Sequence, residues 1–196
     1  MVTKNTLLFK EGVLMAKNIL VLTGSPRKGG NTDQLADAFI AAARRSGHTV
    51  TKYATADKNI KGCIDCKSCF ANAGVCVIPD DFPALAPLME QADMVVFATP
   101  LYWFSFPAQL KAAIDRFYSL FLGNRALKEK ECALIAGCGD EDETAFAGMI
   151  KSYQLIAGFL KWRDQGMVLV PGLHDKDAVL STEGLEKAEM LGKSLL

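Results

Sequence analysis

The amino-acid sequence predicts an α/β protein built on a parallel sheet that is covered by helices on both faces. Short apolar segments of strand length alternate with longer segments in which apolar residues recur at helical spacing. The apolar segments at residues 19–22 and 94–99 are continuous rather than alternating, as expected of strands buried on both faces. No linker rich in Pro, Gly or Ser interrupts the series, so we expect a single domain.

We expect five strands alternating with five helices. The strands span residues 19–22, 48–53, 94–99, 132–137 and 167–170, and the helices span residues 32–46, 80–91, 107–121, 143–162 and 182–196. Leu35 and Phe39 recur at helical spacing in the first helix, and Gly47 stands where a C-terminal cap belongs. Pro83 and Pro87 are expected to confine or break the second helix.

The later elements follow from similar signals. The third helix begins with Pro107, and proline is favoured at the first helical position. Its apolar residues form one stripe, and Lys111, Asp115 and Arg116 lie away from the centre of that stripe. We therefore expect these three residues to form a solvated or interfacial helix face. The fifth strand is apolar and ends before Pro171.

Composition excludes several function classes. Of 196 residues, 50% are hydrophobic, and Lys plus Arg equals Asp plus Glu at 22 each, so the net charge gives no reason to expect a nucleic-acid or membrane partner. The apolar stretches are too short to span a membrane and the N-terminus lacks the apolar core of a secretion signal, so we expect a cytoplasmic protein. Residues 1–14 fit no element and are expected to be a flexible extension or an over-long start, which leaves the domain at residues 15–196.

The turn after the first strand has the composition of a phosphate-binding loop. Ser25 and Thr32 supply hydroxyl groups, and Arg27 and Lys28 supply positive charge. Gly29 and Gly30 allow backbone N–H groups to approach an anion. The helix that follows directs its free N–H groups to the same place. Neither G-x-x-x-x-G-K-[ST] nor G-x-G-x-x-G is present, which disfavours a Walker or classical dinucleotide site. The alternative is an ordinary turn rich in Gly and Ser.

Three loops are expected at the carboxyl ends of the strands, where open parallel sheets bind ligands: residues 24–31, 100–106 and 137–142. The second loop contains Tyr102, Trp103 and Phe104 and suits a flat aromatic ring system, although such a loop can also be a dimer contact or part of the core. In the third loop, Cys138 is placed to touch a bound ring.

Four of the six cysteines are clustered. Cys63, Cys66, Cys69 and Cys76 have the spacing C-x2-C-x2-C-x6-C, and four cysteines complete the ligand set of a [4Fe-4S] cluster. Structural zinc also accepts four cysteines, but it generally uses two separated pairs. Free thiols remain an alternative, whereas disulfides are disfavoured in a cytoplasmic protein.

Three other residues are expected to have structural roles. Cys132 lies in an apolar strand and is interpreted as a packing residue. His48 and His174 have no partner visible in the sequence and are expected to be surface or strand-end residues rather than catalytic bases.

Three motifs in order carry a family resemblance: residues 25–32, the cysteine loop at 63–81, and residues 99–111. Together they resemble the NADPH-dependent FMN reductase branch of the flavodoxin-like superfamily, and within it the iron-sulfur flavoproteins. The resemblance covers residues 17–195 and implies a flavodoxin-like doubly wound sheet of order 2-1-3-4-5 with FMN as cofactor.

The resemblance also implies which residues bind cofactors. The phosphate of FMN is expected against Ser25, Arg27, Asn31 and Thr32, and its ring against the second and third loops. The full set of residues expected to bind FMN is Ser25, Arg27, Lys28, Gly29, Asn31, Thr32, Pro100, Leu101, Tyr102, Trp103, Phe104, Gly137, Cys138, Gly139 and Asp140. The four clustered cysteines occupy the positions that hold a [4Fe-4S] cluster near the flavin in iron-sulfur flavoproteins.

The leading hypothesis is an NAD(P)H-dependent FMN oxidoreductase. A reduced nicotinamide transfers hydride to the flavin, and a quinone, free flavin, metal ion or iron-sulfur cluster then takes the electrons, without a protein acid or base at the hydride step. The alternatives are an electron carrier that receives electrons from a ferredoxin-like protein and a zinc-stabilised binding module without redox function. A homodimer or homotetramer is expected, because a second subunit readily completes an exposed flavin site flanked by aromatic residues.

Overall fold

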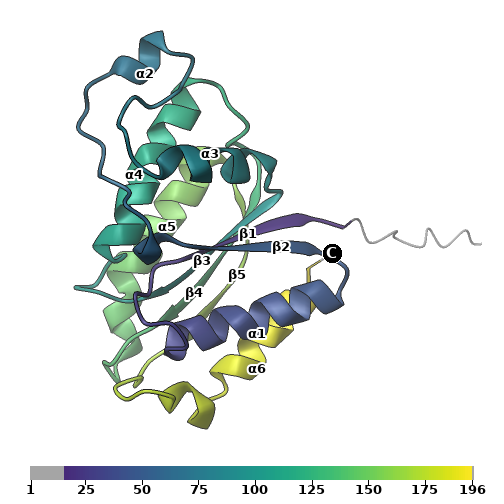
Figure 1. Cartoon of the computed structure of the whole chain (residues 1–196). Helices are drawn as coiled ribbons and strands as arrows, with labels where there is room; N and C mark the ends of the chain where they lie inside the picture. The colour runs from purple at the N-terminus through teal and green to yellow at the C-terminus, as the bar shows by residue number, and fades with distance from the viewer. Residues whose placement is uncertain (1–15, 196) are drawn as a thin grey trace, which may run out of the picture.

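The computed structural model describes residues 16–195, and its strands form one five-stranded parallel sheet (Figure 1). The strands are β1 (Asn18–Thr23), β2 (Thr49–Ala54), β3 (Met94–Pro100), β4 (Glu131–Gly137) and β5 (Arg163–Val170). Their order is β2-β1-β3-β4-β5, and each neighbouring pair is parallel. This confirms the predicted sheet of order 2-1-3-4-5. The expectation for residues 1–14 lies outside the described residues.

Helices cover both faces of the sheet (Figure 1). On one face lie α1 (Asn31–Arg45) and α6 (Gly184–Lys193), and on the other lie α3 (Phe82–Gln91), α4 (Ala108–Leu122) and α5 (Ala147–Leu160). The long loop between β2 and α3 contains a short helix, α2 (Ser68–Ala71), and packs on α4. The 3-10 turns are η1 (Thr55–Asp57), η2 (Glu143–Phe146) and η3 (Ala178–Ser181).

Each face of the sheet has its own hydrophobic core, because side chains alternate along every strand. Leu20 and Leu22 of β1 belong to the core beneath α3, α4 and α5, whereas Ile19 and Val21 belong to the core beneath α1 and α6. All four side chains are at most 2% exposed. Burial on both faces explains why this strand appears in the sequence as a continuous apolar run.

Several predicted elements differ from the structure in their bounds or their continuity. Pro83 lies in the first turn of α3, and Pro87 lies inside that helix without ending it. The predicted helix at 143–162 divides into η2 and α5, and Asp142 caps η2 by accepting a hydrogen bond from Thr144 N–H at 2.8 Å. Strand β5 begins at Arg163, earlier than expected. The sequence analysis missed its first residues because they are polar and exposed, as is common in edge strands, and carry no apolar pattern.

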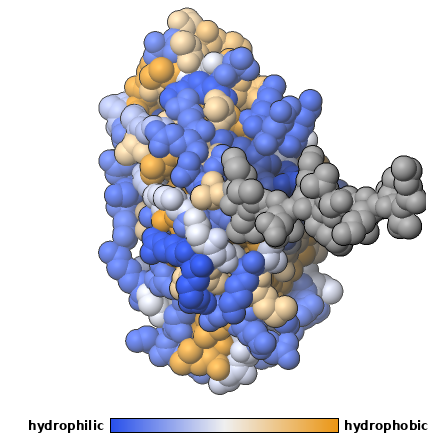
Figure 2. Space-filling model, turned by 90° about the vertical axis from the view of Figure 1, so that its right-hand side faces the viewer, coloured by the Kyte–Doolittle hydropathy of each residue, from blue (hydrophilic) through white to orange (hydrophobic). Residues whose placement is uncertain are grey.

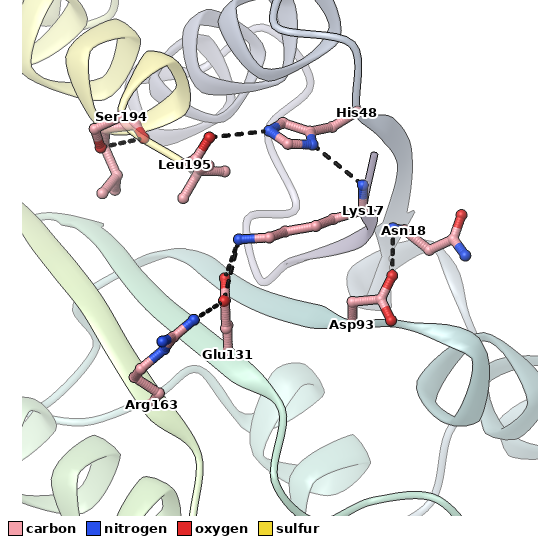
Figure 3. Close-up of polar contacts among 9 residues, drawn as sticks. Lys17, Asn18, His48, Asp93, Glu131, Arg163, Ser194 and Leu195 are labelled. Atoms are coloured by element: carbon pink, nitrogen blue, oxygen red, sulfur yellow. Dashed lines mark hydrogen bonds and ion pairs between the residues drawn. The ribbon is translucent and has the colours of Figure 1, made fainter. Parts of the chain in front are cut away.

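Polar contacts hold together the edge of the sheet at which the strands begin (Figure 3). His48 Nδ1 accepts a hydrogen bond from Lys17 N–H at 3.2 Å, and His48 Nε2 lies 3.4 Å from the Leu195 carbonyl oxygen. Lys17 Nζ pairs with Glu131 at 2.9 Å, and Arg163 contacts the same carboxylate. His48 precedes a strand as expected, but it is only 4% exposed and is not a surface residue. The face at this edge is largely hydrophilic (Figure 2).

A buried ion pair lies on the opposite side of the sheet from α1. Arg116 of α4 is 1% exposed, so its expected place on a solvated helix face is wrong. Its Nη1 donates to Asp80 Oδ2 at 2.7 Å and to the Lys61 carbonyl at 2.9 Å, and its guanidinium lies 4.7 Å from the centre of the Phe82 ring. Burial raises the pKa of Asp80, but hydrogen bonds from Arg116 and from backbone N–H groups outweigh burial and lower that pKa below its usual value.

This ion pair closes the cysteine-bearing loop at its base. Asp80 also accepts a hydrogen bond from Lys61 N–H at 3.0 Å, so the two ends of the segment at residues 62–79 are joined. Asn59 and Asp81 are linked next to them by two further hydrogen bonds, of 2.8 and 3.0 Å. Arg116 therefore fixes both ends of the loop to α4.

Replacing Asp80 with alanine should destabilise the protein strongly. The change leaves the Arg116 guanidinium buried without its carboxylate, which costs about 3–5 kcal/mol. The matched control is Glu90→Ala, which removes the partner of Arg125 from a more exposed pair and should cost at most about 1 kcal/mol. Urea unfolding at neutral pH measures both values.

The pH dependence of unfolding gives a second test of the same pair. Because the folded-state pKa of Asp80 is lowered, its contribution to stability is present above the unfolded pKa of about 3.9 and is lost as pH falls through the folded pKa. The unfolding free energy of the wild type should thus fall more steeply below about pH 4 than that of Asp80→Ala. Equal slopes for the two proteins would contradict the assignment.

Candidate functional site

The strand order reverses next to β1, and a cavity lies at the carboxyl ends of the strands there. The connection from β1 runs to α1 on one face, and that from β3 runs to α4 on the other. Loops from both faces can therefore meet in the crevice between the strands. The cavity has a volume of about 160 Å³ and is lined by Ser25, Arg27, Gly30, Asn31, Thr32, Pro100, Leu101, Tyr102, Gly137, Cys138, Gly139 and Leu173.

The loop between β1 and α1 forms one wall of this cavity. Arg27 N–H donates to Ser25 Oγ at 3.1 Å, and Gly30 N–H donates to the Arg27 carbonyl at 3.1 Å, which folds the loop into a tight turn. Helix α1 begins at Asn31, and among residues 16–195 no side chain caps its N-terminal N–H groups. An uncapped helix start on a cavity is a favourable place for an anion.

Asn31 lies at this helix start, but its side chain is already engaged. Nδ2 donates to the Asp175 carbonyl at 2.7 Å, and Oδ1 accepts a hydrogen bond from Val179 N–H at 3.3 Å. The side chain thus ties the start of α1 to the segment after β5 and holds the wall of the cavity in place. Thr32, the next residue, is buried and lines the cavity.

Lys28 and Gly29 lie outside the cavity lining, although the sequence motif includes them. Lys28 Nζ pairs with Asp57 at 3.1 Å and is highly exposed. Gly29 has a φ of +66°, and its N–H donates to Asp33 at 2.9 Å. The glycine therefore shapes the turn, because a left-handed φ is unfavourable for other residues.

The aromatic loop after β3 divides into lining and exposed parts. Pro100, Leu101 and Tyr102 line the cavity, whereas Trp103 and Phe104 do not. Tyr102 exchanges two backbone hydrogen bonds with Ser105, of 3.0 and 3.1 Å, and Trp103 and Phe104 form the turn between them with φ values of +46° and +62°. Positive φ is costly for aromatic residues, and such strain clusters at functional sites. Trp103 is 94% exposed at the tip.

The loop after β4 approaches the cavity through glycine. A Cβ on Gly137 would lie 2.6 Å from Leu173 Cδ1 and 3.1 Å from Thr32 Cγ2, so a larger residue would clash with two side chains that line the cavity. Cys138 is 7% exposed, and its thiol donates to the Asp140 carbonyl at 3.4 Å. Burial raises the pKa of the Cys138 thiol, which keeps it protonated at neutral pH. The Asp140 side chain lies outside the lining.

Leu173 is a lining residue that the sequence analysis missed. Its N–H donates to the Cys138 carbonyl at 2.7 Å, which joins the segment after β5 to the loop after β4. Its position in the sequence could have indicated this role, because Leu173 follows the carboxyl end of the fifth strand and the other loops of the site also follow carboxyl ends of strands. His174, beside it, lies 3.7 Å from Glu141 at the surface.

The four clustered cysteines line a second, smaller cavity between their loop and α4, with a volume of about 20 Å³. Cys63 and Cys66 are exposed, and Cys69 and Cys76 are half-buried. Asp65 and Lys67 adopt left-handed φ values of +49° and +60°, which turn the chain between the cysteines. The remaining lining residues are Ile64, Asp65, Lys67, Ile78, Asp115, Arg116, Tyr118 and Ser119.

The chemistry of these thiols differs along the loop. Hydrogen bonds from the backbone and the hydroxyl of Ser68 lower the pKa of Cys66, whereas burial raises the pKa of Cys69. Within residues 16–195, none of the six cysteines of the chain forms a disulfide. In residues 16–195, no three His, Cys, Asp or Glu side chains lie close enough to hold one metal ion. A polynuclear cluster places its own iron and sulfide between the ligands and requires wider spacing.

The cysteine loop also packs tightly on α4 away from its base. Gly74 has a φ of +75°, and a Cβ there would lie 2.5 Å from Gly123 Cα and 2.6 Å from the Ser119 carbonyl oxygen. Nearby, the rings of Phe70 and Tyr118 meet edge to face at 6.2 Å. The loop is therefore held at its base by Arg116 and at its far side by a backbone contact that requires glycine.

Helix α4 is the element that connects the two cavities. It starts after the aromatic loop of the first cavity, and four of its residues line the second: Asp115, Arg116, Tyr118 and Ser119. Within the described part of the chain, the two cavities have no lining residue in common. The described helices include none that is long and apolar enough to cross a membrane.

Known proteins are similar to this chain in sequence and in fold. An iron-sulfur flavoprotein of Archaeoglobus fulgidus is 33% identical over 181 residues, which cover 89% of this chain and 76% of that protein. An NAD(P)H:quinone oxidoreductase of Methanothermobacter marburgensis has a similar structure, with a TM-score of 0.73, 17% identity, and coverage of 93% of this chain and 100% of that one. An FMN-dependent NADH-azoreductase of Bacillus anthracis, solved in complex with FMN, has a TM-score of 0.68 at 15% identity and covers 91% of this chain and 99% of that one.

The structural neighbours, with their low identity, show that the fold is flavodoxin-like. The sequence match is more specific. Residues 17–165, most of the chain, match the family described as NADPH-dependent FMN reductase. The protein belongs to the NADPH-dependent FMN reductase family, whose cofactor is FMN.

Proposed function

We propose that FMN binds in the cavity beside β1 and carries electrons from a reduced nicotinamide to a small-molecule acceptor or to an iron-sulfur cluster. Family membership makes the protein an FMN-dependent oxidoreductase. The observation that supports the position of FMN is the coincidence, on one cavity, of Arg27, a buried Thr32, an uncapped helix start and glycine at position 137. These groups suit a phosphate at one end and a close-packed ring at the other.

The charge around the start of α1 is favourable for the phosphate. Arg27 supplies a cation on the cavity wall, and the Thr32 hydroxyl supplies a hydrogen bond donor. Asp33 is an acidic residue in the first turn, but Lys52 Nζ lies 2.6 Å from its carboxylate and Gly29 N–H donates to it. Because its charge is compensated, Asp33 does not oppose the binding of an anion.

The size of the cavity indicates how much of FMN is enclosed. At about 160 Å³ it is smaller than the roughly 300 Å³ of ordinary small-molecule sites. We infer that the phosphate end lies inside and that the ring lies at the mouth, against residues 100–102 and 137–139. An accessible ring lets a nicotinamide approach without movement of the core.

When bound, FMN accepts a hydride from a reduced nicotinamide and releases electrons singly or in pairs. The chain itself orients the ring and limits side reactions. Cys138 stays protonated because burial raises its thiol pKa, and it presents a weakly polar surface to the ring. Leu101 N–H already donates to the Gly137 carbonyl at 2.8 Å. We infer that backbone groups of the third loop, such as those of Gly139, hydrogen-bond the ring and adjust its reduction potential.

The cysteine cavity favours one acceptor among those that the family chemistry allows. Cys63, Cys66, Cys69 and Cys76 all face one small cavity, and their spacing suits four ligands of a [4Fe-4S] cluster. We infer that these cysteines hold such a cluster and that the protein exchanges electrons through it with a ferredoxin-like partner or a small molecule. The exposed Trp103 beside the first cavity favours a homodimer or homotetramer that covers this side chain.

The nicotinamide half of the proposal is tested by anaerobic mixing of the FMN-loaded protein with NADPH or NADH. At least one of them should bleach the visible flavin absorbance much faster than it bleaches free FMN, because the protein holds both partners in reacting geometry. Stopped-flow absorbance measures both rates. Failure of both nicotinamides to bleach the bound flavin would exclude the reductase reaction.

Replacing Arg27 with alanine should weaken the binding of FMN about tenfold, because a charged hydrogen bond to phosphate is lost at an exposed position. The affinity for riboflavin, which lacks the phosphate, should not change. The matched control is Lys28→Ala, which removes the same charge from the neighbouring residue outside the cavity. Fluorescence titration with both flavins measures the ratio of affinities, and an equal loss for FMN and riboflavin would contradict the phosphate position.

Replacing Gly74 with alanine should disrupt the cysteine cavity and leave the FMN cavity intact. The new Cβ would meet the backbone of α4 and force the loop away from it. Iron binding after anaerobic reconstitution should weaken at least about tenfold, as for other losses of support around metal ligands. Gly62→Ala is the control in the same loop, since a Cβ there has open space. Equal iron content in the two variants would show that contact with α4 does not organise the cysteines.

A further inference from the structure

We propose that Arg116 is a positioning residue of the cysteine site and donates a hydrogen bond from its Nε to a sulfur atom of the bound cluster. The inference rests on the proposed function, because it requires that the four cysteines hold an iron-sulfur cluster. It assigns to a buried arginine of α4 a role in the stability and reduction potential of that cluster.

The hydrogen bonds of the guanidinium leave one edge free. Nη1 contacts Asp80 and the Lys61 carbonyl, Nη2 lies 3.5 Å from Asp80, and one face of the group lies over Phe82. Arg116 Nε is buried and has no hydrogen bond partner in the described part of the chain. A buried N–H group without an acceptor is unusual and calls for a ligand, ion or water.

The free edge belongs to a residue that lines the cysteine cavity. Arg116 is among the residues that surround this cavity together with the four cysteines. The guanidinium of Arg116 is held in one orientation by its hydrogen bonds to Asp80 and to the Lys61 carbonyl. The rigid fork of arginine, unlike the flexible ammonium of lysine, keeps its N–H groups in set directions.

An anionic sulfur is the acceptor that matches this donor. Cysteine thiolates and the sulfides of a cluster carry negative charge and accept hydrogen bonds, and such bonds help to set the reduction potential. The other charged residues of the cavity are exposed: Asp65 and Lys67 lie 4.0 Å apart, and Asp115 pairs with Lys111. Arg116 is therefore the buried positive group of this cavity.

The hydrogen bond stabilises the reduced cluster more than the oxidised one, because the reduced cluster has the greater negative charge. The ion pair of Arg116 with Asp80 has almost no net charge. Its effect on the reduction potential of the cluster therefore comes from the Nε–H group that points at the sulfur and from any change that leaves one of the two charges uncompensated. Removing each partner is expected to shift the reduction potential in opposite directions.

The test compares Arg116→Lys with Asp80→Asn in the full-length, reconstituted protein. Arg116→Lys keeps a positive charge for Asp80 but loses Nε–H. The variant protein should therefore bind the iron of the cluster about tenfold more weakly, and the midpoint potential of the cluster should become more negative. A tenfold change in the preference for the reduced form equals about 59 mV for one electron. Asp80→Asn keeps Nε–H and removes the compensating carboxylate, so its potential should become more positive.

Arg125→Lys is the matched control, because Arg125 follows α4 and pairs with Glu90 away from the cysteine cavity. It should leave the potential unchanged. Iron and sulfide content and potentiometric titration by electron paramagnetic resonance provide the readouts. FMN content verifies folding of each variant, since the FMN cavity has no described lining residue in common with the cysteine cavity.

The outcomes separate the role of Arg116 from the proposed function. Opposite shifts in Arg116→Lys and Asp80→Asn support the inference. Unchanged potential and iron content in Arg116→Lys would overturn it while the cluster itself stands. A wild-type protein that takes up no iron and sulfide would overturn both the cluster and this role, whereas the reaction of bound flavin with nicotinamide would still test the reductase activity.

Discussion

The reversal of strand order beside β1 is the constraint on which the site depends. Because β1 and β3 are neighbours while their connections run to helices on opposite faces, their carboxyl ends leave a crevice that neither helix fills. Three loops and the segment after β5 line this crevice. Glycine at position 137 and the uncapped start of α1 keep it open and favourable to an anion. The fold thus provides a crevice at this place before any particular side chain is considered.

Helix α4 extends this organisation to the cysteines. Its start follows the aromatic loop of the first cavity, and its middle and end hold the cysteine loop through Arg116 and through the contact between Gly74 and Gly123. The buried pair of Arg116 and Asp80 joins the two ends of a loop that has little hydrophobic core of its own. One rigid helix consequently links a site suited to FMN with a cavity that contains four thiols.

Much of this arrangement could be predicted from the sequence, because buried parallel strands and amphipathic helices leave strong local patterns. The order of motifs along the chain also led to the correct family and to most residues of the first cavity. The burial of Arg116 and of His48 was not predicted, because burial of a polar side chain depends on partners far away in the chain, such as Asp80 and Leu195. The positions of Trp103 and Phe104 outside the cavity depend on backbone angles that composition does not specify.

The central claim is that the crevice beside β1 holds FMN with its phosphate at the start of α1. A crystal structure of the protein grown with FMN tests this most directly. We expect phosphate density within hydrogen-bond distance of Ser25, Thr32 or the first N–H groups of α1, and ring density against residues 100–102. Flavin density at any other place, with the crevice occupied only by solvent, would show that FMN does not bind there.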